Sequence, residues 1–268
     1  MKSILERLKK YCSRSERGFL GFGEALAKEQ VPSNPVTEPK RSQNPKRPPL
    51  PPAKPNGYSI SENALAAAAA LLLLARAASA QTEEGFTSLF DGKTFDGWQT
   101  ATEHTNTWTI ADGALVAHGD RCHIFYVGDP KPFKNFELKV DVLTGPHSNG
   151  GIYFHTHYQD VGWPTNGFEC QVNVTHSDWK KTGSLYDVAN LGNTPAQDGE
   201  WYTQDITVQG NKVTVKIKDI IVLEYTEPDG AQPGKVFTRK LADGTFALQG
   251  HDPKSVVHYK NIRVKRLD

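Results

Sequence analysis

The sequence predicts an all-β protein, an antiparallel β-sandwich or jelly roll, preceded by a leader of quite different composition. After Gln81, apolar residues recur at every second position in short segments, which is the period of a β-strand. Gly, Asp, Asn and Pro separate these segments, and no stretch sustains the 3.6-residue period of a helix. The 188 residues after Ala80 are ample for one β-rich domain and short for two.

Residues 1–62 form a basic, proline-rich segment that we expect to be disordered. Nine of the 17 prolines lie between Pro32 and Pro55, and proline removes backbone donors and fixes φ. A ligand for an aromatic groove is the alternative, because the segment contains the run PPLPP. So long a stretch before a signal segment is unusual, and a start codon annotated too far upstream would explain it.

Residues 63–80, NALAAAAALLLLARAASA, have the pattern of a signal peptide. The apolar run from Ala64 to Ala75 is shorter than the roughly 20 residues that span a bilayer, and it ends near an A-x-A cleavage site at Ala78-Ser79-Ala80. Cleavage after Ala80 would export a product without a stable membrane span to the periplasm or the extracellular space. A buried Ala/Leu helix is the alternative.

Charge and cysteine content restrict the function of the two parts. Residues 1–80 carry 13 basic and 6 acidic side chains, whereas the remainder carries 18 and 24. A nucleic-acid site needs a clustered positive face, so the acidic balance argues against nucleic acid as a partner. Cys122 and Cys170 remain in the second part, either as one disulfide or as two free thiols.

The strand segments of residues 85–268 can be followed in order. Asp112-Gly113 stands between WTIA and ALVAH and favours a type I′ hairpin turn. Segments 136–142 and 213–217 alternate apolar with polar or charged residues, as strands with one buried face do.

Three further segments, GGIYFHTHY, GFECQVNV and GTFALQGHD, carry different chemistry on their two faces, because alternate side chains of a strand point in opposite directions. The apolar sets are Ile152, Phe154, Phe168, Cys170, Val172, Val174, Phe246 and Leu248. The opposite sets are Tyr153, His155, His157, Glu169, Gln171, Asn173, Gln249 and His251. If these strands are neighbours, the second faces form one surface suited to a sugar, with aromatic rings for C–H groups and planar side chains for hydroxyls.

His155, His157 and Glu169 are the candidates for chemistry on this surface. The His-x-His spacing puts two imidazoles on one face, and Glu169 could complete a two-histidine, one-carboxylate site for a divalent metal. A plain polar surface pair is the alternative for the histidines. Glu169 is also the better-supported acid or base, because a position between Phe168 and Cys170 can desolvate the carboxylate and raise its pKa. A hydrogen-bonded structural role is its alternative.

Trp163 and Trp179 follow strands, in predicted loops. Exposed loop tryptophans are typical of binding or of loop anchoring. We expect both to stack on a sugar, with plugging of the sandwich end as the alternative.

An ordered set of segments resembles the 3-keto-disaccharide hydrolase domain family. The segments are FTSLFDGKTFDGW, WTIADGALVAHG, FKNFELKVDV, SNGGIYFHT, FECQVN, KTGSLYDV, DGEWYTQDITVQGNKVTVKI, FALQGHDP and VVHYKNIRVKRL. The resemblance covers nearly all of residues 85–267, and it implies a concanavalin-like β-sandwich, an exported bacterial protein and cleavage of glycosides already oxidised to a ketone at C3. Two positions depart from the family pattern. Gly150 replaces a serine, and Lys218-Asp219 replaces the usual Asn-Gly or Asp-Gly, which puts that hairpin in doubt.

The implied reaction assigns roles to the candidate residues. A ketone at C3 acidifies the C2 proton, so elimination at C1 followed by hydration gives net hydrolysis. This chemistry needs a base, an electrophile for the enolate oxygen and an acid for the leaving oxygen. A divalent metal held by His155, His157 and Glu169 would supply the electrophile, with Glu169 as the alternative base. The expected substrate-binding residues are Tyr153, Trp163, Gln171, Trp179, Gln249 and His251. A non-catalytic carbohydrate-binding module would use the same surface and is the second hypothesis.

Overall fold

The computed structural model describes residues 83–268, so the predicted leader and signal segment lie outside the described residues. The described part forms thirteen strands and one short 3-10 helix, η2 (Thr105–Thr107). The strands are β1 (Thr87–Ser88), β2 (Trp98–Thr100), β3 (Trp108–Ala111), β4 (Ala114–Ala117), β5 (Cys122–Tyr126), β6 (Phe136–Thr144), β7 (Asn149–Thr156), β8 (Phe168–Asn173), β9 (Tyr202–Gln209), β10 (Lys212–Ile217), β11 (Ile220–Thr226), β12 (Thr245–Gly250) and β13 (Val257–Arg266). Within residues 83–268, no helix has the length and apolar character needed to cross a membrane.

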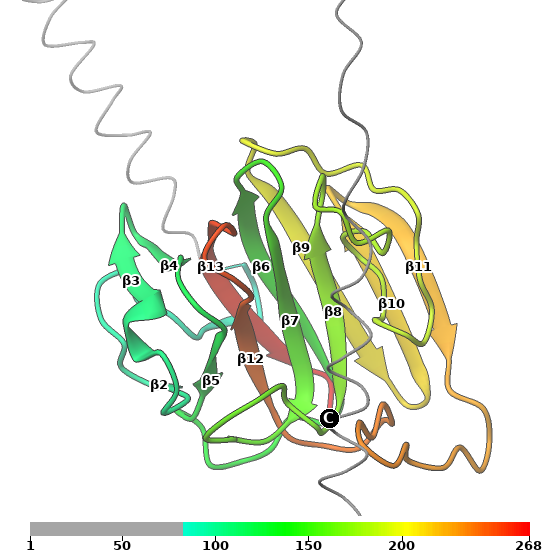
Figure 1. Ribbon diagram of the computed structural model, residues 1–268. Coiled ribbons are helices and arrows are strands. Elements are labelled where there is room, and N and C mark those ends of the chain that lie inside the picture. The colour runs from blue at the N-terminus through cyan, green and yellow to red at the C-terminus, as the bar shows by residue number, and fades with distance from the viewer. Residues whose placement is uncertain (1–82) are drawn as a thin grey trace, which may run out of the picture. The chain divides into compact units, whose positions relative to one another are not determined.

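The strands form two antiparallel sheets that pack face to face (Figure 1). The larger sheet has eight strands in the order β11-β10-β9-β6-β13-β4-β3, with β1 paired to β13. The smaller sheet has five strands in the order β2-β5-β12-β7-β8. The predicted all-β, concanavalin-like sandwich is confirmed.

Large apolar side chains from both sheets meet between the layers. The ring of Phe136 on β6 lies 5.0 Å from that of Phe246 on β12 and 5.9 Å from that of Phe154 on β7, measured between centroids. Cys122 and Cys170 are both free and buried. The core therefore contains the apolar faces that the two-residue period predicts.

Two hairpin turns test the turn predictions. Asp112 and Gly113 have φ values of 51° and 75° and connect β3 to β4, which confirms the predicted type I′ turn. Lys218 and Asp219 have φ values of 52° and 65° and connect β10 to β11 in the same way. The second hairpin therefore forms although neither residue is Asn or Gly.

The register of the smaller sheet brings the polar faces together. Tyr153 on β7 pairs with Glu169 on β8, and two residues earlier Gly151 pairs with Gln171. On the other side of β7, the strand β12 carries Gln249, and β12 pairs with β5 beyond it. These side chains point away from the core, so the predicted polar surface lies on the outer face of the five-stranded sheet.

Candidate active site

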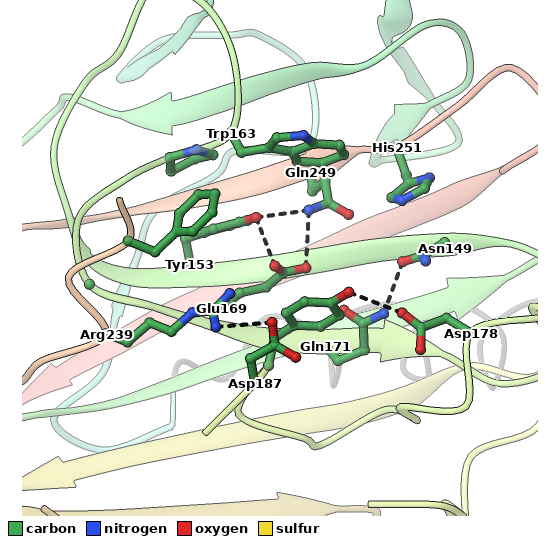
Figure 2. A pocket seen from close by; sticks show the side chains of 14 residues that line it. Asn149, Tyr153, Trp163, Glu169, Gln171, Asp178, Asp187, Arg239, Gln249 and His251 are labelled. Carbon is green, nitrogen blue, oxygen red and sulfur yellow. Dashed lines mark hydrogen bonds and ion pairs between the residues drawn. The ribbon is translucent and has the colours of Figure 1, made fainter. Parts of the chain in front are cut away.

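A pocket of about 370 Å³ opens on this outer face. Its floor is formed by strand residues, namely Tyr153, Glu169, Gln171 and Gln249. Its walls come from the connections between strands, and their residues are Trp163, Pro164, Asp178, Tyr186, Asp187, Phe237, Arg239 and His251. Figure 2 shows Tyr153 and Gln249 meeting Glu169, with Arg239 and Asp187 on one side and His251 and Asp178 on the other. A volume of this size suits a small ligand such as a sugar.

Two hydrogen bonds hold Glu169 at the pocket floor, and a third joins the two donor residues. The Tyr153 hydroxyl donates to Glu169 Oε2 at 2.9 Å, and Gln249 Nε2 donates to Glu169 Oε1 at 3.0 Å. Gln249 Nε2 also donates to the Tyr153 hydroxyl at 2.9 Å. Both carboxylate oxygens are therefore oriented by donors, one on the adjacent strand β7 and one on β12 beyond it (Figure 2).

The pKa of Glu169 is raised to about 7, because burial disfavours the charged carboxylate more than its hydrogen bonds from Tyr153 and Gln249 favour it. Arg239 and Lys180 lower this pKa by their positive charge. Burial and the nearby Glu169 charge hold the pKa of Tyr153 well above its usual value, so its hydroxyl stays a proton donor. The predicted rise in the pKa of Glu169 has the expected direction and cause, and it places the carboxylate where it can exchange a proton near neutral pH.

Gly151 provides the space that the carboxylate occupies. A methyl group at this position would lie 2.7 Å from Glu169 Oε1 and 3.0 Å from its Cγ. Any side chain here would push Glu169 off the floor, so the glycine is required by the site and not only by the strand.

The walls carry charged groups around an aromatic ring. Asp178 accepts a hydrogen bond from the Tyr186 hydroxyl at 3.2 Å, and the Arg239 guanidinium pairs with Asp187 at 3.0 Å. Lys180 lies over the Tyr186 ring at 3.7 Å and also pairs with Asp187. The wall is therefore a connected set of ion pairs that keeps one cation, Arg239, beside the floor carboxylate.

His155 is not on the pocket surface, and its predicted metal role there is wrong. Phe154 pairs with Phe246 and Thr156 pairs with Thr245, which leaves His155 as the extra residue of a β-bulge with φ of 55°. The bulge breaks the alternation on which the prediction depends. The His155 ring is 2% exposed and both of its nitrogens contact backbone groups outside the pocket.

His157 lies beyond the end of β7 and is exposed. Nowhere in residues 83–268 do three His, Cys, Asp or Glu side chains group so that they could hold a metal ion. His155, His157 and Glu169 therefore do not fit a divalent metal as one ligand set, and no step of a reaction is assigned to one.

The loop tryptophans have different environments. Trp163 lines the pocket, with its ring centroid 5.4 Å from that of His251, and the Arg121 guanidinium lies over it at 5.1 Å. His251 in turn contacts Asp252 at 2.7 Å through Nδ1. Trp179 does not line the pocket and is 59% exposed. The structure thus brings Trp163 and His251 to the site but not Trp179.

Several pocket residues escaped the sequence reasoning. Arg239, Asp187 and Tyr186 lie in connections without a periodic pattern, so only the folded chain reveals their place. His123 on β5 pairs with Gln249 in register; it is not a lining residue but packs behind two of them. It is fully buried, edge-on to Tyr153 and Trp163, and burial lowers its pKa to about 3, so the ring stays neutral.

Comparison with known proteins gives a consistent result. The sequence profile of the 3-keto-alpha-glucoside-1,2-lyase-like domain matches residues 85–265. A Bacteroides thetaiotaomicron protein named 3-keto-disaccharide hydrolase is 30% identical in an alignment 232 positions long, which covers 69% of this chain and 79% of that protein. A Parabacteroides distasonis structure, solved as a candidate glycosyl hydrolase, has a TM-score of 0.59 and 25% identity over 69% of this chain and 95% of its own. A second structure from that organism has a TM-score of 0.54 at 22% identity, covers 68% of this chain and 99% of its own, and supports the fold alone.

Proposed function

This chain belongs to the 3-keto-alpha-glucoside-1,2-lyase-like domain family, and from that premise we propose that it cleaves the glycosidic bond of 3-keto-glycosides or 3-keto-disaccharides. The observation that carries the proposal is Glu169, a carboxylate with a pKa of about 7 at the floor of a sugar-sized pocket. Membership of the family supports the substrate class, and the pocket supports a proton-transfer reaction.

Glu169 acts as the base that removes the C2 proton of the bound 3-ketosugar. The electrons of the C2–H bond move toward the C3 carbonyl, whose oxygen gains negative charge as an enolate. Once Glu169 is protonated, the Tyr153 hydroxyl no longer faces a charged acceptor there. The hydroxyl can then donate its hydrogen bond to the enolate oxygen, which now carries the negative charge that was on Glu169.

Expulsion of the C1 oxygen with its electron pair completes the elimination. Protonated Glu169 is the acid that can return its proton to this leaving oxygen, and water then adds at C1 while C2 regains a proton. The sum is hydrolysis. The side-chain amide oxygens of Gln171 and Gln249 are buried and have no hydrogen-bond partner among the described residues. The two residues line the floor beside Glu169.

We also propose that the protein is exported to the periplasm or the extracellular space. The support is the apolar run of residues 64–75 followed by the A-x-A site. N-terminal sequencing of the secreted protein should find Gln81 as the first residue, and a secreted product that retains Met1 would contradict this site.

The deciding experiment incubates the protein with 3-keto-trehalose, before and after chelator treatment, and follows release of 3-keto-glucose. We expect release by the wild type and almost none by Glu169→Gln at unchanged fold. Release that chelator abolishes and a divalent ion restores would require a metal site other than the one predicted from the sequence. Saturable binding of plain glycans without turnover would instead support the carbohydrate-binding module.

A further inference from the structure

The bulge at His155 lies where three segments of the chain meet. Gly167, just before β8, and Gly244, just before β12, both pack against it. A methyl group on Gly167 would lie 2.0 Å from the Phe154 carbonyl oxygen, and one on Gly244 would lie 2.4 Å from that of Thr156. This close packing fixes the backbone around His155. The His155 side chain lies between the surrounding segments and contacts them.

The two ring nitrogens of His155 contact two different segments. Nε2 lies 3.0 Å from the carbonyl oxygen of Lys134, and the Ala242 N–H reaches Nδ1 at 3.2 Å. Both contacts are hydrogen bonds only in the neutral tautomer that carries its proton on Nε2 and a lone pair on Nδ1. Burial lowers the pKa of His155, which favours the neutral ring.

The contact at Ala242 lies near one end of the connection between β11 and β12, the segment that carries Phe237 and Arg239 into the pocket wall. The end itself is held at Gly244, which bridges to Phe133, so Ala242 is the next backbone contact toward the wall. Arg239 has φ of 42°, a left-handed conformation that persists only where neighbouring contacts hold the backbone. On one side, Thr238 N–H donates to the Thr165 carbonyl at 2.8 Å. On the other side, Leu241 N–H donates to Glu227 and Ala242 N–H to His155.

We propose that His155 is a positioning residue whose Nδ1 lone pair holds the chain at Ala242 and thereby keeps Phe237 and Arg239 in the pocket wall. The anchoring itself is independent of the reaction, and its effect on substrate rests on the proposed function. His155 therefore supports the pocket wall from behind and is not one of the side chains that line the pocket floor.

Two substitutions separate the two hydrogen bonds. Asparagine puts its Oδ1 near the place of Nδ1 and its left-handed conformation is well tolerated, so His155→Asn keeps the acceptor for Ala242. Glutamine puts a donor near the place of Nε2, so His155→Gln keeps the contact to Lys134 and loses the acceptor. The pair is matched because each variant removes one contact.

Hydrogen–deuterium exchange of the full-length protein tests the anchor without any assay of activity. We expect amides of residues 236–244 to exchange about tenfold faster in His155→Gln, the effect of losing one buried hydrogen bond, and close to the wild-type rate in His155→Asn. Equal protection in all three proteins would overturn the proposal, and so would equal loss in both variants. If either variant fails to fold, NMR of the wild type decides, because a proton on Nδ1 of His155 contradicts the anchor.

Kinetics then connect the anchor to the pocket. His155→Gln should raise KM for the 3-keto-glycoside about tenfold with a smaller change in kcat, and in an Arg239→Gln background the same substitution should have a much smaller effect. An undiminished effect in that background would show that His155 does not act through Arg239. Absence of turnover in the wild type would overturn the proposed function but leave the exchange result to decide the anchor.

Discussion

Replacement of Glu169 by glutamine should change how the stability of the protein depends on pH. The wild-type carboxyl has a pKa of about 7 in the folded state against its ordinary value of 4.5, because the pocket desolvates it. Glutamine has nearly the same shape and an amide that can still meet Tyr153 and Gln249, but it does not titrate. The substitution therefore removes the protonation equilibrium at residue 169, while the side chain at the floor of the pocket keeps its volume.

The size of the effect follows from linkage between protonation and folding. A raised folded-state pKa means that the folded protein binds the proton more tightly than the unfolded chain does. The stabilisation is fully present below pH ~4.5 and is lost as the pH rises to ~7. At about 1.4 kcal/mol per pKa unit, the difference corresponds to ~2–3 kcal/mol once partial contact of Glu169 with pocket water is included. The free energy of unfolding of the wild type should fall by this amount relative to Glu169→Gln across the interval.

Urea unfolding followed by tryptophan fluorescence at pH 4.5 and pH 8 measures this difference. The other titrating groups are the same in both proteins. Their contributions therefore cancel when the change in unfolding free energy between the two pH values is compared between the wild type and Glu169→Gln. Parallel stability curves would refute the desolvated carboxyl. Turnover gives an independent reading, since kcat/KM of the wild type should rise with pH to a plateau above ~7 and Glu169→Gln should lose roughly 10²–10⁴-fold.

Three further predictions concern other parts of the structure. Gly151→Ala should displace the floor carboxylate and lower kcat about a hundredfold, measured with circular dichroism as the control for folding, and wild-type turnover would contradict the close packing. The double change Lys218→Asn and Asp219→Gly should raise the free energy of unfolding by ~1–2 kcal/mol in urea titration, because both residues have positive φ, and a loss of stability would contradict the turn type. Trp163→Ala should weaken sugar binding roughly fivefold to tenfold by calorimetry, whereas the exposed Trp179→Ala should leave it unchanged, and equal effects would contradict the placement of the two rings.

Much of the pocket floor could be predicted from the sequence. Alternation puts Tyr153, Glu169, Gln171 and Gln249 on the polar faces of their strands. The structure makes these strands neighbours and brings all four side chains together. The reason is that side-chain direction in a regular strand is a local property of the backbone. The same local rule failed at His155, because a bulge adds one residue and turns the side chain away.

The walls of the pocket could not be predicted in this way. Trp163 and Trp179 look alike in the sequence, both being loop tryptophans after strands, yet only Trp163 reaches the pocket. Arg239 reaches Asp187 across more than fifty residues of chain, in a connection without a pattern. Loop direction depends on contacts with distant segments, and these contacts leave no period in the sequence.

The sequence by itself determined that residues 83–268 form a β-sandwich, and it determined the chemistry of the floor, since both depend on a two-residue period. Only the tertiary structure decided that Glu169 lies in a space opened by Gly151, and that His155 holds the chain behind the wall. The physical reason is that the pKa of a carboxyl and the partner of an imidazole depend on which distant groups surround them.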